Sequence, residues 1–331
     1  INASRLTWIS ALMLFPAWGY REVMAGRIRC ASATKVMKKN KIFHKTNTPT
    51  MRFFRKSIIF YRGSVFRAFI LILFISFGLF LNTRYVFAHE FWIEPERWIL
   101  EQDETLTAQI KVGQHFRGDA SPFIRDWFSR FELHSFNLSV PVEGHDGDLP
   151  AFKAKLIQPG LNLLLYHSTP DTVYYSTMEK FEKFLKREGL LSILKQHKEQ
   201  SYPEKSFSET YVRCAKSLIQ VNGKSEFRDF FTGMPLEMVA SFDPYDLKKP
   251  FGELQLLWNG SGIGGLLVRV FHKQGKMMET EYLTNDQGKV NIHLQAPGEY
   301  LVNAVHMMEG AFNRGEFWTS YWASLTFHVP Q

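Results

Sequence analysis

Apolar and polar residues alternate along much of the second part of this 331-residue chain, at the two-residue period of a β-strand. In residues 104–112, every second side chain from Leu106 to Val112 is apolar, so these side chains share one face. Further candidate strands occupy residues 131–140, 152–157 and 161–167. The pattern predicts an antiparallel β unit over about residues 89–170.

The apolar period then changes to that of a helix. Between Met178 and Lys198, apolar side chains recur mostly at steps of three and four residues, and Gly189 interrupts them. This predicts a helix that is bent or split at the glycine. The next segment, Ser208 to Val221, is compatible with either a short helix or a strand-like link.

Short strands return after residue 233. Six candidates are separated by turn residues, and they cover residues 254–258, 266–272, 279–283, 290–294, 300–306 and 321–329. We therefore predict a mainly β protein with two β-sandwich-like units, immunoglobulin- or transthyretin-like, and a helical insertion between them. The predicted domains are residues 89–231, with the insertion at about 174–200, and residues 232–331.

The first 88 residues have a different character. A basic segment precedes an apolar run from Ala68 to Leu81, which is shorter than the roughly 20 residues needed to cross a bilayer. Val86 and Ala88 supply small residues at the positions that signal peptidase requires. We predict a signal peptide over residues 51–88 and a periplasmic protein, with an uncleaved anchor as the alternative. Residues 1–50 lack hydrophobic periodicity and are interpreted as a non-native or upstream extension.

The formal net charge of +8 arises in this leading part. After Ala88 the chain has 25 basic and 31 acidic residues, so it has no electrostatic reason to bind nucleic acid. Its net negative charge is better suited to binding a cation than a nucleic acid. Cys214 is the single cysteine of that part, which excludes an intramolecular disulfide and a cysteine-based zinc cluster.

Histidines provide the candidate chemistry. Cleavage after Ala88 would free the α-amine of His89, and an amine and an imidazole on one residue can chelate Ni(II) or Cu(II). His306 ends a predicted strand with Glu309 just beyond it, and His115 follows another strand. We predict a nickel or copper site from His89, His306, His115 and Glu309. The alternatives are a chance N-terminal residue, a hydrogen-bonded core histidine and a solvated loop.

No enzyme motif is evident. The glycine-rich residues 260–265 lack the ending of a phosphate loop and precede a predicted strand. Neither a Gly-x-Ser-x-Gly elbow nor a catalytic cysteine signature occurs. We therefore expect no catalytic residues.

Several ordered segments carry a family resemblance. They include residues 88–95 (AHEFWIEP), 211–218 (YVRCAKSL), 235–239 (PLEMV), 305–307 (VHM) and 321–327 (YWASLTF). The chain resembles an exported family of unknown function associated with nickel uptake, whose members include periplasmic components of some nickel transport systems. In that family His89 and His306 fall on histidine positions, whereas Phe317 stands where members commonly carry an acid.

The resemblance implies a non-enzymatic periplasmic protein that binds a nickel-like transition metal and assists its uptake or handling. Its partners would be metal-uptake transporter components in the membrane. Nucleic acid would not be a partner. One alternative is a copper enzyme with a histidine brace at His89, which performs oxidative chemistry. Another is a structural or glycan-binding sandwich that exposes a row of tryptophans.

Overall fold

The computed structural model describes residues 89–331 except 137, 156–157, 224–227, 295 and 311–315. The predicted extension over residues 1–50 and the predicted signal peptide over residues 51–88 lie outside the described residues. Within the described part, no helix has the length and apolar character that a membrane span requires.

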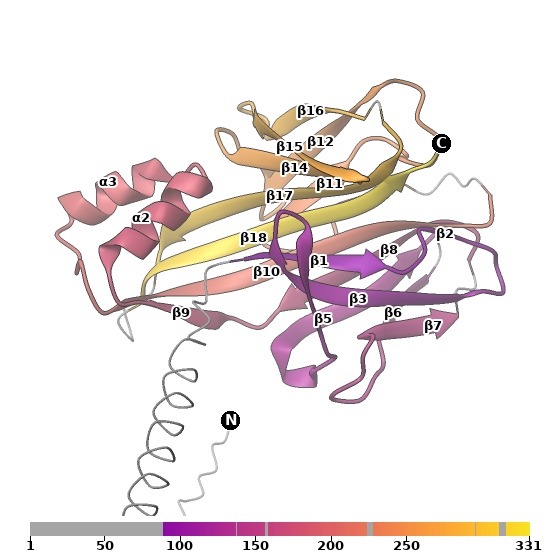
Figure 1. The fold of residues 1–331 in the computed structure, drawn as a ribbon, viewed down its shortest axis with the longest axis horizontal. Coiled ribbons are helices and arrows are strands. Elements are labelled where there is room, and N and C mark those ends of the chain that lie inside the picture. The colour runs from indigo at the N-terminus through magenta and orange to yellow at the C-terminus, as the bar shows by residue number, and fades with distance from the viewer. Residues whose placement is uncertain (1–88, 137, 156–157, 224–227, 295, 311–315) are drawn as a thin grey trace, which may run out of the picture. The chain divides into compact units, whose positions relative to one another are not determined.

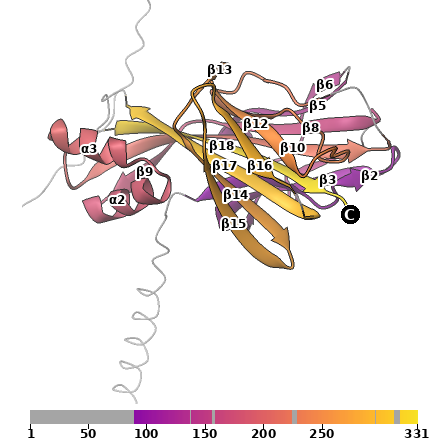
Figure 2. The same cartoon turned by 90° about the horizontal axis from the view of Figure 1, so that it is seen from above.

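A ten-stranded sheet forms the middle of the molecule (Figure 1). Eight strands run in the order β15-β14-β17-β18-β10-β8-β5-β6, and β2 and β9 also pair with β10. Their bounds are β2 Ile99–Leu100, β5 Phe128–Ser135, β6 Leu138–Pro141, β8 Gly160–Ser168, β9 Asp171–Tyr175, β10 Phe207–Val221, β14 Leu267–Gln274, β15 Lys276–Leu283, β17 Gly298–Glu309 and β18 Glu316–Val329. Figure 2 shows β18, β17, β14 and β15 side by side.

A smaller sheet packs on one face of this large sheet. It consists of β1 (Glu90–Pro95), β3 (Thr105–Gln114), β4 (Arg117–Ser121) and β7 (Phe152–Lys155). Phe91 and Ile110 from the smaller sheet pack against Phe131, Tyr166 and Ile219 from the large one. A short 3-10 helix (Arg125–Trp127) precedes β5. This apolar layer is the core of the first sandwich.

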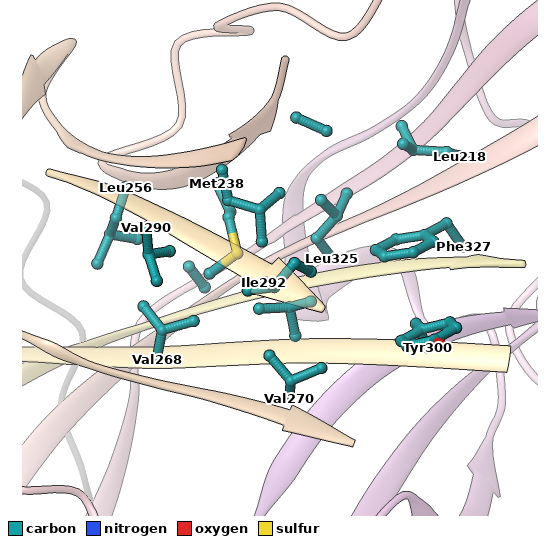
Figure 3. Packing of buried hydrophobic residues seen from close by; sticks show 14 of the residues in the cluster. Leu218, Met238, Leu256, Val268, Val270, Val290, Ile292, Tyr300, Leu325 and Phe327 are labelled. Atoms are coloured by element: carbon teal, nitrogen blue, oxygen red, sulfur yellow. The ribbon is translucent and has the colours of Figure 1, made fainter. Parts of the chain in front are cut away.

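A third sheet covers the opposite face. It contains β11 (Leu236–Ala240), β12 (Phe251–Trp258), β13 (Ser261–Gly262) and β16 (Lys289–His293). Met238, Leu256 and Ile292 from this sheet meet Val270 and Leu325 from the large sheet in a second core (Figure 3). All strand pairs among the described residues of 251–329 are antiparallel, as in a β-sandwich, the fold predicted for this part of the chain.

Two helices cover the end of the large sheet near β9. Helix α2 (Met178–Arg187) and helix α3 (Leu191–Glu199) are separated at Gly189, whose φ of +72° is in the region that favours glycine. Phe181 and Phe184 on α2 pack with Trp318 and Trp322 of β18. The predicted helix split at Gly189 is therefore confirmed.

The mainly β class with sandwich-like units and a helical insertion is confirmed. The uncertain segment after residue 208 belongs to the 15-residue strand β10, which pairs in parallel with β18. Consequently, one sheet contains strands from both sides of the predicted boundary at residue 231. The two sandwiches share this sheet as a common middle layer.

Candidate functional site

His306 belongs to the core shared with the third sheet. On β17 it lies opposite Tyr321 of β18, and its ring meets the ring of Trp258 edge-on at 4.7 Å between centroids. Burial lowers the pKa of His306 below its usual value. Its side chain therefore points to the face of the large sheet that carries β11, β12 and β16.

His89 lies on the other side of the large sheet. It precedes β1. Desolvation by burial lowers the pKa of His89, the charge of Glu90 opposes this shift, and the charge of Arg213 on β10 adds to it, so His89 lies near Arg213. The guanidinium of Arg213 lies over the Phe91 ring of the first sandwich. Arg213 is in register with Trp322, and neighbouring strand residues point to opposite faces. His89 and His306 are therefore on opposite faces, which corrects the prediction of a joint site.

Glu309 and His115 are also separate from His306. Glu309 is three residues beyond His306 on a strand, so it points to the opposite face, where Gln196 of α3 donates a hydrogen bond to it at 2.9 Å. The Nδ1 atom of His115 lies 2.9 Å from a carboxylate oxygen of Glu279. Among the described residues, no group of three or more His, Cys, Asp or Glu side chains is placed to hold a metal ion.

A cavity of about 340 Å³ opens beside Arg213 in the first sandwich. It is formed where β1 and β3 meet the large sheet, next to the segment before β5 and the connection between β8 and β9. Its lining is Phe91, Ile110, Ser121, Pro122, Trp127, Tyr166, Ser168, Thr169, Pro170, Asp171, Tyr211 and Arg213.

Arg213 is the distinctive group of this cavity. Its guanidinium carbon lies 5.0 Å from the Phe91 ring centre and 4.8 Å from the Tyr211 ring centre, which holds the planar group between aromatic surfaces. Across the described part of the chain, this guanidinium makes no hydrogen bond and no ion pair. Burial lowers the pKa of Arg213, although the side chain stays protonated at any ordinary pH.

The polar groups around Arg213 are fixed by their own partners. The Tyr211 hydroxyl donates to Asp171 Oδ2 at 2.5 Å, and Tyr166 donates to the carbonyl of Trp127 at 3.1 Å. The backbone N–H of Arg213 donates to Ser168 Oγ at 2.9 Å, so the hydrogen of that hydroxyl is available to a ligand. The arrangement provides one fixed cation, aromatic walls and a hydroxyl donor.

Sequence reasoning missed this cavity because it is assembled from five distant segments. One signal was present in the sequence. Arg213 sits between Val212 and Cys214, in a stretch where both flanking side chains are apolar and buried. A charged residue at such a position needs a functional or structural reason. Cys214 itself is a buried thiol, and burial raises its pKa to about 12.

The three stacked β-layers and this cavity define a β-sandwich protein with a cavity in its first sandwich. The chain belongs to the family described as domain of unknown function (DUF4198), whose model matches residues 86–308. No protein with a curated description matches the sequence.

Among solved structures, the chain is similar to the D0-D1 domain of intimin, at 12% sequence identity. The match covers 71% of this chain and 96% of that chain, with a TM-score of 0.18.

Proposed function

We propose that this protein is an exported, non-enzymatic binding protein, and that it holds a small flat carboxylate against Arg213. The observation that carries the proposal is the guanidinium of Arg213, which has no hydrogen-bonded or ion-paired anion among the described residues and contacts two aromatic rings in a cavity. A guanidinium offers two parallel N–H donors that match a carboxylate. The charge of Asp171 and the aromatic rings offset only part of its desolvation, since the pKa of Arg213 stays lowered.

The rest of the cavity fits a planar ligand. Phe91 and Tyr166 provide buried ring surface, and Trp127, half exposed at 51%, stands at the rim. The volume of about 340 Å³ lies at the lower end of the range of roughly 300–1,000 Å³ for small-molecule sites. Ser168 can donate a hydrogen bond. An aromatic or similarly flat carboxylate would use all of these groups.

Benzoate is the probe for this site. We expect Arg213→Gln to weaken benzoate binding by about 10- to 100-fold, because the lost bond to a charged group contributes roughly 1.5–3 kcal/mol. Calorimetric titration measures the affinity, and quenching of Trp127 emission reports the location. Benzamide, which has the same shape without the charge, should bind far more weakly.

Arg125→Gln is the matched control. Arg125 also lies over an aromatic ring, at 4.8 Å from the centre of Phe128, but it does not line the cavity. This variant should bind benzoate as the unchanged protein does. Equal affinity for benzoate and benzamide, or equal affinity in the two arginine variants, would contradict the carboxylate site.

A second candidate function is transition-metal handling at His89, with periplasmic localisation and transporter components in the membrane as partners. It is favoured by the desolvation of the imidazole, which lowers the pKa of His89 and keeps a nitrogen unprotonated near neutral pH. Cleavage after Ala88 would add the α-amine as a second nitrogen. A carboxylate held at Arg213 would place negative charge near such a nickel or copper ion, so both functions can operate together.

Exported protein tests the metal proposal. N-terminal sequencing should read His89 first, and Ni(II) affinity should fall with pH because protons compete for the nitrogens. One alanine inserted before His89 should remove most of the Ni(II) affinity, whereas His306→Ala should leave it unchanged, since His306 lies on the other face of the sheet. A retained leader, or equal affinity with and without the inserted alanine, would rule out the chelate.

A further inference from the structure

Three ionisable side chains form a cluster in the interior, away from the Arg213 cavity. Lys216 lies on β10, Asp229 precedes β11, and Glu237 lies on β11. All three side chains are completely buried. Lys216 Nζ is 2.7 Å from Asp229 Oδ1 and 2.9 Å from Glu237 Oε1. Buried charges at this spacing carry a large desolvation penalty, which removal of the charges would relieve.

The same contacts resemble those of a reaction site. An amine nitrogen touches a carboxyl group, and a second carboxylate touches the amine. We propose that Lys216 and Asp229 become joined by an intramolecular amide (isopeptide) bond, with Glu237 as the group that moves the proton.

The step balances without an external reagent. A proton passes from Lys216 to Asp229, which gives an amine and a carboxylic acid at unchanged net charge. The Nζ lone pair attacks Cγ, and Glu237 takes a proton from the nitrogen and gives it to Oδ1. Oδ1 then leaves as water, so one C–N bond forms and one C–O bond breaks, with no oxidation or reduction. Because the fold already holds the reacting groups in contact, the activation barrier does not include the entropic cost of bringing them together.

The surroundings of Asp229 favour this reaction. The backbone N–H of Ala240 donates to Asp229 Oδ2 at 2.7 Å, and Oδ2 is the oxygen that develops negative charge when the amine attacks Cγ. Burial raises the pKa of Asp229, which favours its neutral, reactive form. Burial opposes the charge on Lys216, but the two carboxylates together outweigh it and raise the pKa, so the ion pair is the resting form and the neutral pair a minor, reactive one.

Glu237 is held in place for proton transfer. The Glu237 carboxylate accepts hydrogen bonds from the backbone N–H and the hydroxyl of Thr232, both at 3.0 Å, and from the backbone N–H of Met234 at 3.2 Å. These donors remain after Lys216 and Asp229 have lost their charges. The product therefore leaves one buried carboxylate with several donors in place of three buried charges.

The bond would connect the large sheet to the third sheet. β10 belongs to the first and β11 to the second, and Asp229 accepts its hydrogen bond from the end of β11. The part of the chain after Ala88 has a single cysteine and no disulfide to provide such a connection. The amide would serve this purpose in a form that no reductant breaks.

Mass spectrometry of the folded, purified chain tests the proposal. The intact mass should be lower than the sequence mass by one water molecule. Trypsin cuts after Lys224 and Arg228, so Lys216 and Asp229 fall in separate peptides unless they are linked. We expect one linked peptide pair, and we expect fragment ions to place the link at these two residues. Separate, unmodified peptides from the folded protein would overturn the proposal.

Variants identify the roles. Asp229→Asn should give the same linked product with release of ammonia, whereas Lys216→Arg should give none. Glu237→Gln should slow or stop the reaction, and linkage at the original rate in that variant would overturn the role of Glu237. The similarly short but partly exposed pair Lys273–Glu299, at 2.8 Å, should stay unlinked in every sample. Circular dichroism confirms that each variant is folded, and the mass of the unchanged protein decides the central claim independently.

Discussion

Replacing Arg269 with methionine is expected to lower the free energy of unfolding by about 3–5 kcal/mol, the effect of removing one partner from a buried ion pair. Arg269 on β14 is 2% exposed, and its nitrogens contact three carboxylates. Glu188, at the end of α2, lies 3.0 Å away, and Glu279 and Glu281 on β15 lie at 2.8 and 3.0 Å. Methionine preserves the apolar bulk but leaves the buried Glu188 with the more distant guanidinium of Arg187, 3.5 Å away, as its counter-charge.

Urea unfolding at neutral pH measures this loss. The loss in free energy of unfolding should be smaller at acidic pH. Burial raises the pKa of Glu188, so its carboxyl can take up a proton and no longer needs a counter-charge. Arg97→Met is the control, since Arg97 and Glu104 form an ion pair at the surface whose contribution is about 0–1 kcal/mol. If both variants lost the same small amount, the Arg269 cluster would not stabilise the junction between α2 and the β14–β15 hairpin.

Stability should also decrease as the pH rises through neutrality, because of Glu209. This carboxyl on β10 is completely buried, accepts hydrogen bonds from Tyr175 and Ser320, and has its pKa raised by burial from 4.5 to about 7. The folded protein holds the proton more tightly than the unfolded chain. The contribution of the protonated Glu209 carboxyl to the free energy of unfolding is thus complete below pH 4.5 and is lost as the pH rises through about 7.

The size of the Glu209 effect follows from the two pKa values. The interval from 4.5 to about 7 corresponds to about 3 kcal/mol, at about 1.4 kcal/mol per pH unit. Other groups titrate in the same range, so the measurement is the difference between the unchanged protein and Glu209→Gln. The variant should be more stable than the unchanged protein at pH values above 7, and the difference should narrow towards pH 4.5. Parallel stability profiles would show that Glu209 is not the cause.

Alternation identified the strands that have one exposed face. In β3, the buried side chains of Leu106, Ala108 and Ile110 alternate with more exposed ones, as a half-buried strand requires. β10 is different because it lies between two layers and is buried on both sides, so period-two alternation disappears. Its interior also holds Arg213 and Lys216, which made the segment read as ambiguous.

The ligand set could not be predicted, because it depends on which sheet face each side chain occupies. His306 and Glu309 are three residues apart, which places neighbours together on a helix but on opposite faces of a strand. His89 lies near Arg213 of β10, and His306 is on β17, and both of these strands pair with β18. The two histidines are nevertheless on different sides of the large sheet. Only the pairing of β10 with β18 reveals this separation.

The parallel pair of β10 and β18 also determines the order in which this protein can fold. β18 lies between β17 and β10 and joins the two halves of the large sheet. Its partner β10 ends at Val221, and β18 begins only at Glu316, so the pairing closes a very long loop. High contact order of this kind makes folding slow.

A chain that emerges with its N-terminus first, from a ribosome or a membrane channel, therefore cannot complete the sheet until residues 316–329 arrive. Until then β10 and β17 each have an unpaired edge that can pair with another chain. The interval before β18 docks is the period in which this protein is most exposed to aggregation and most in need of a chaperone.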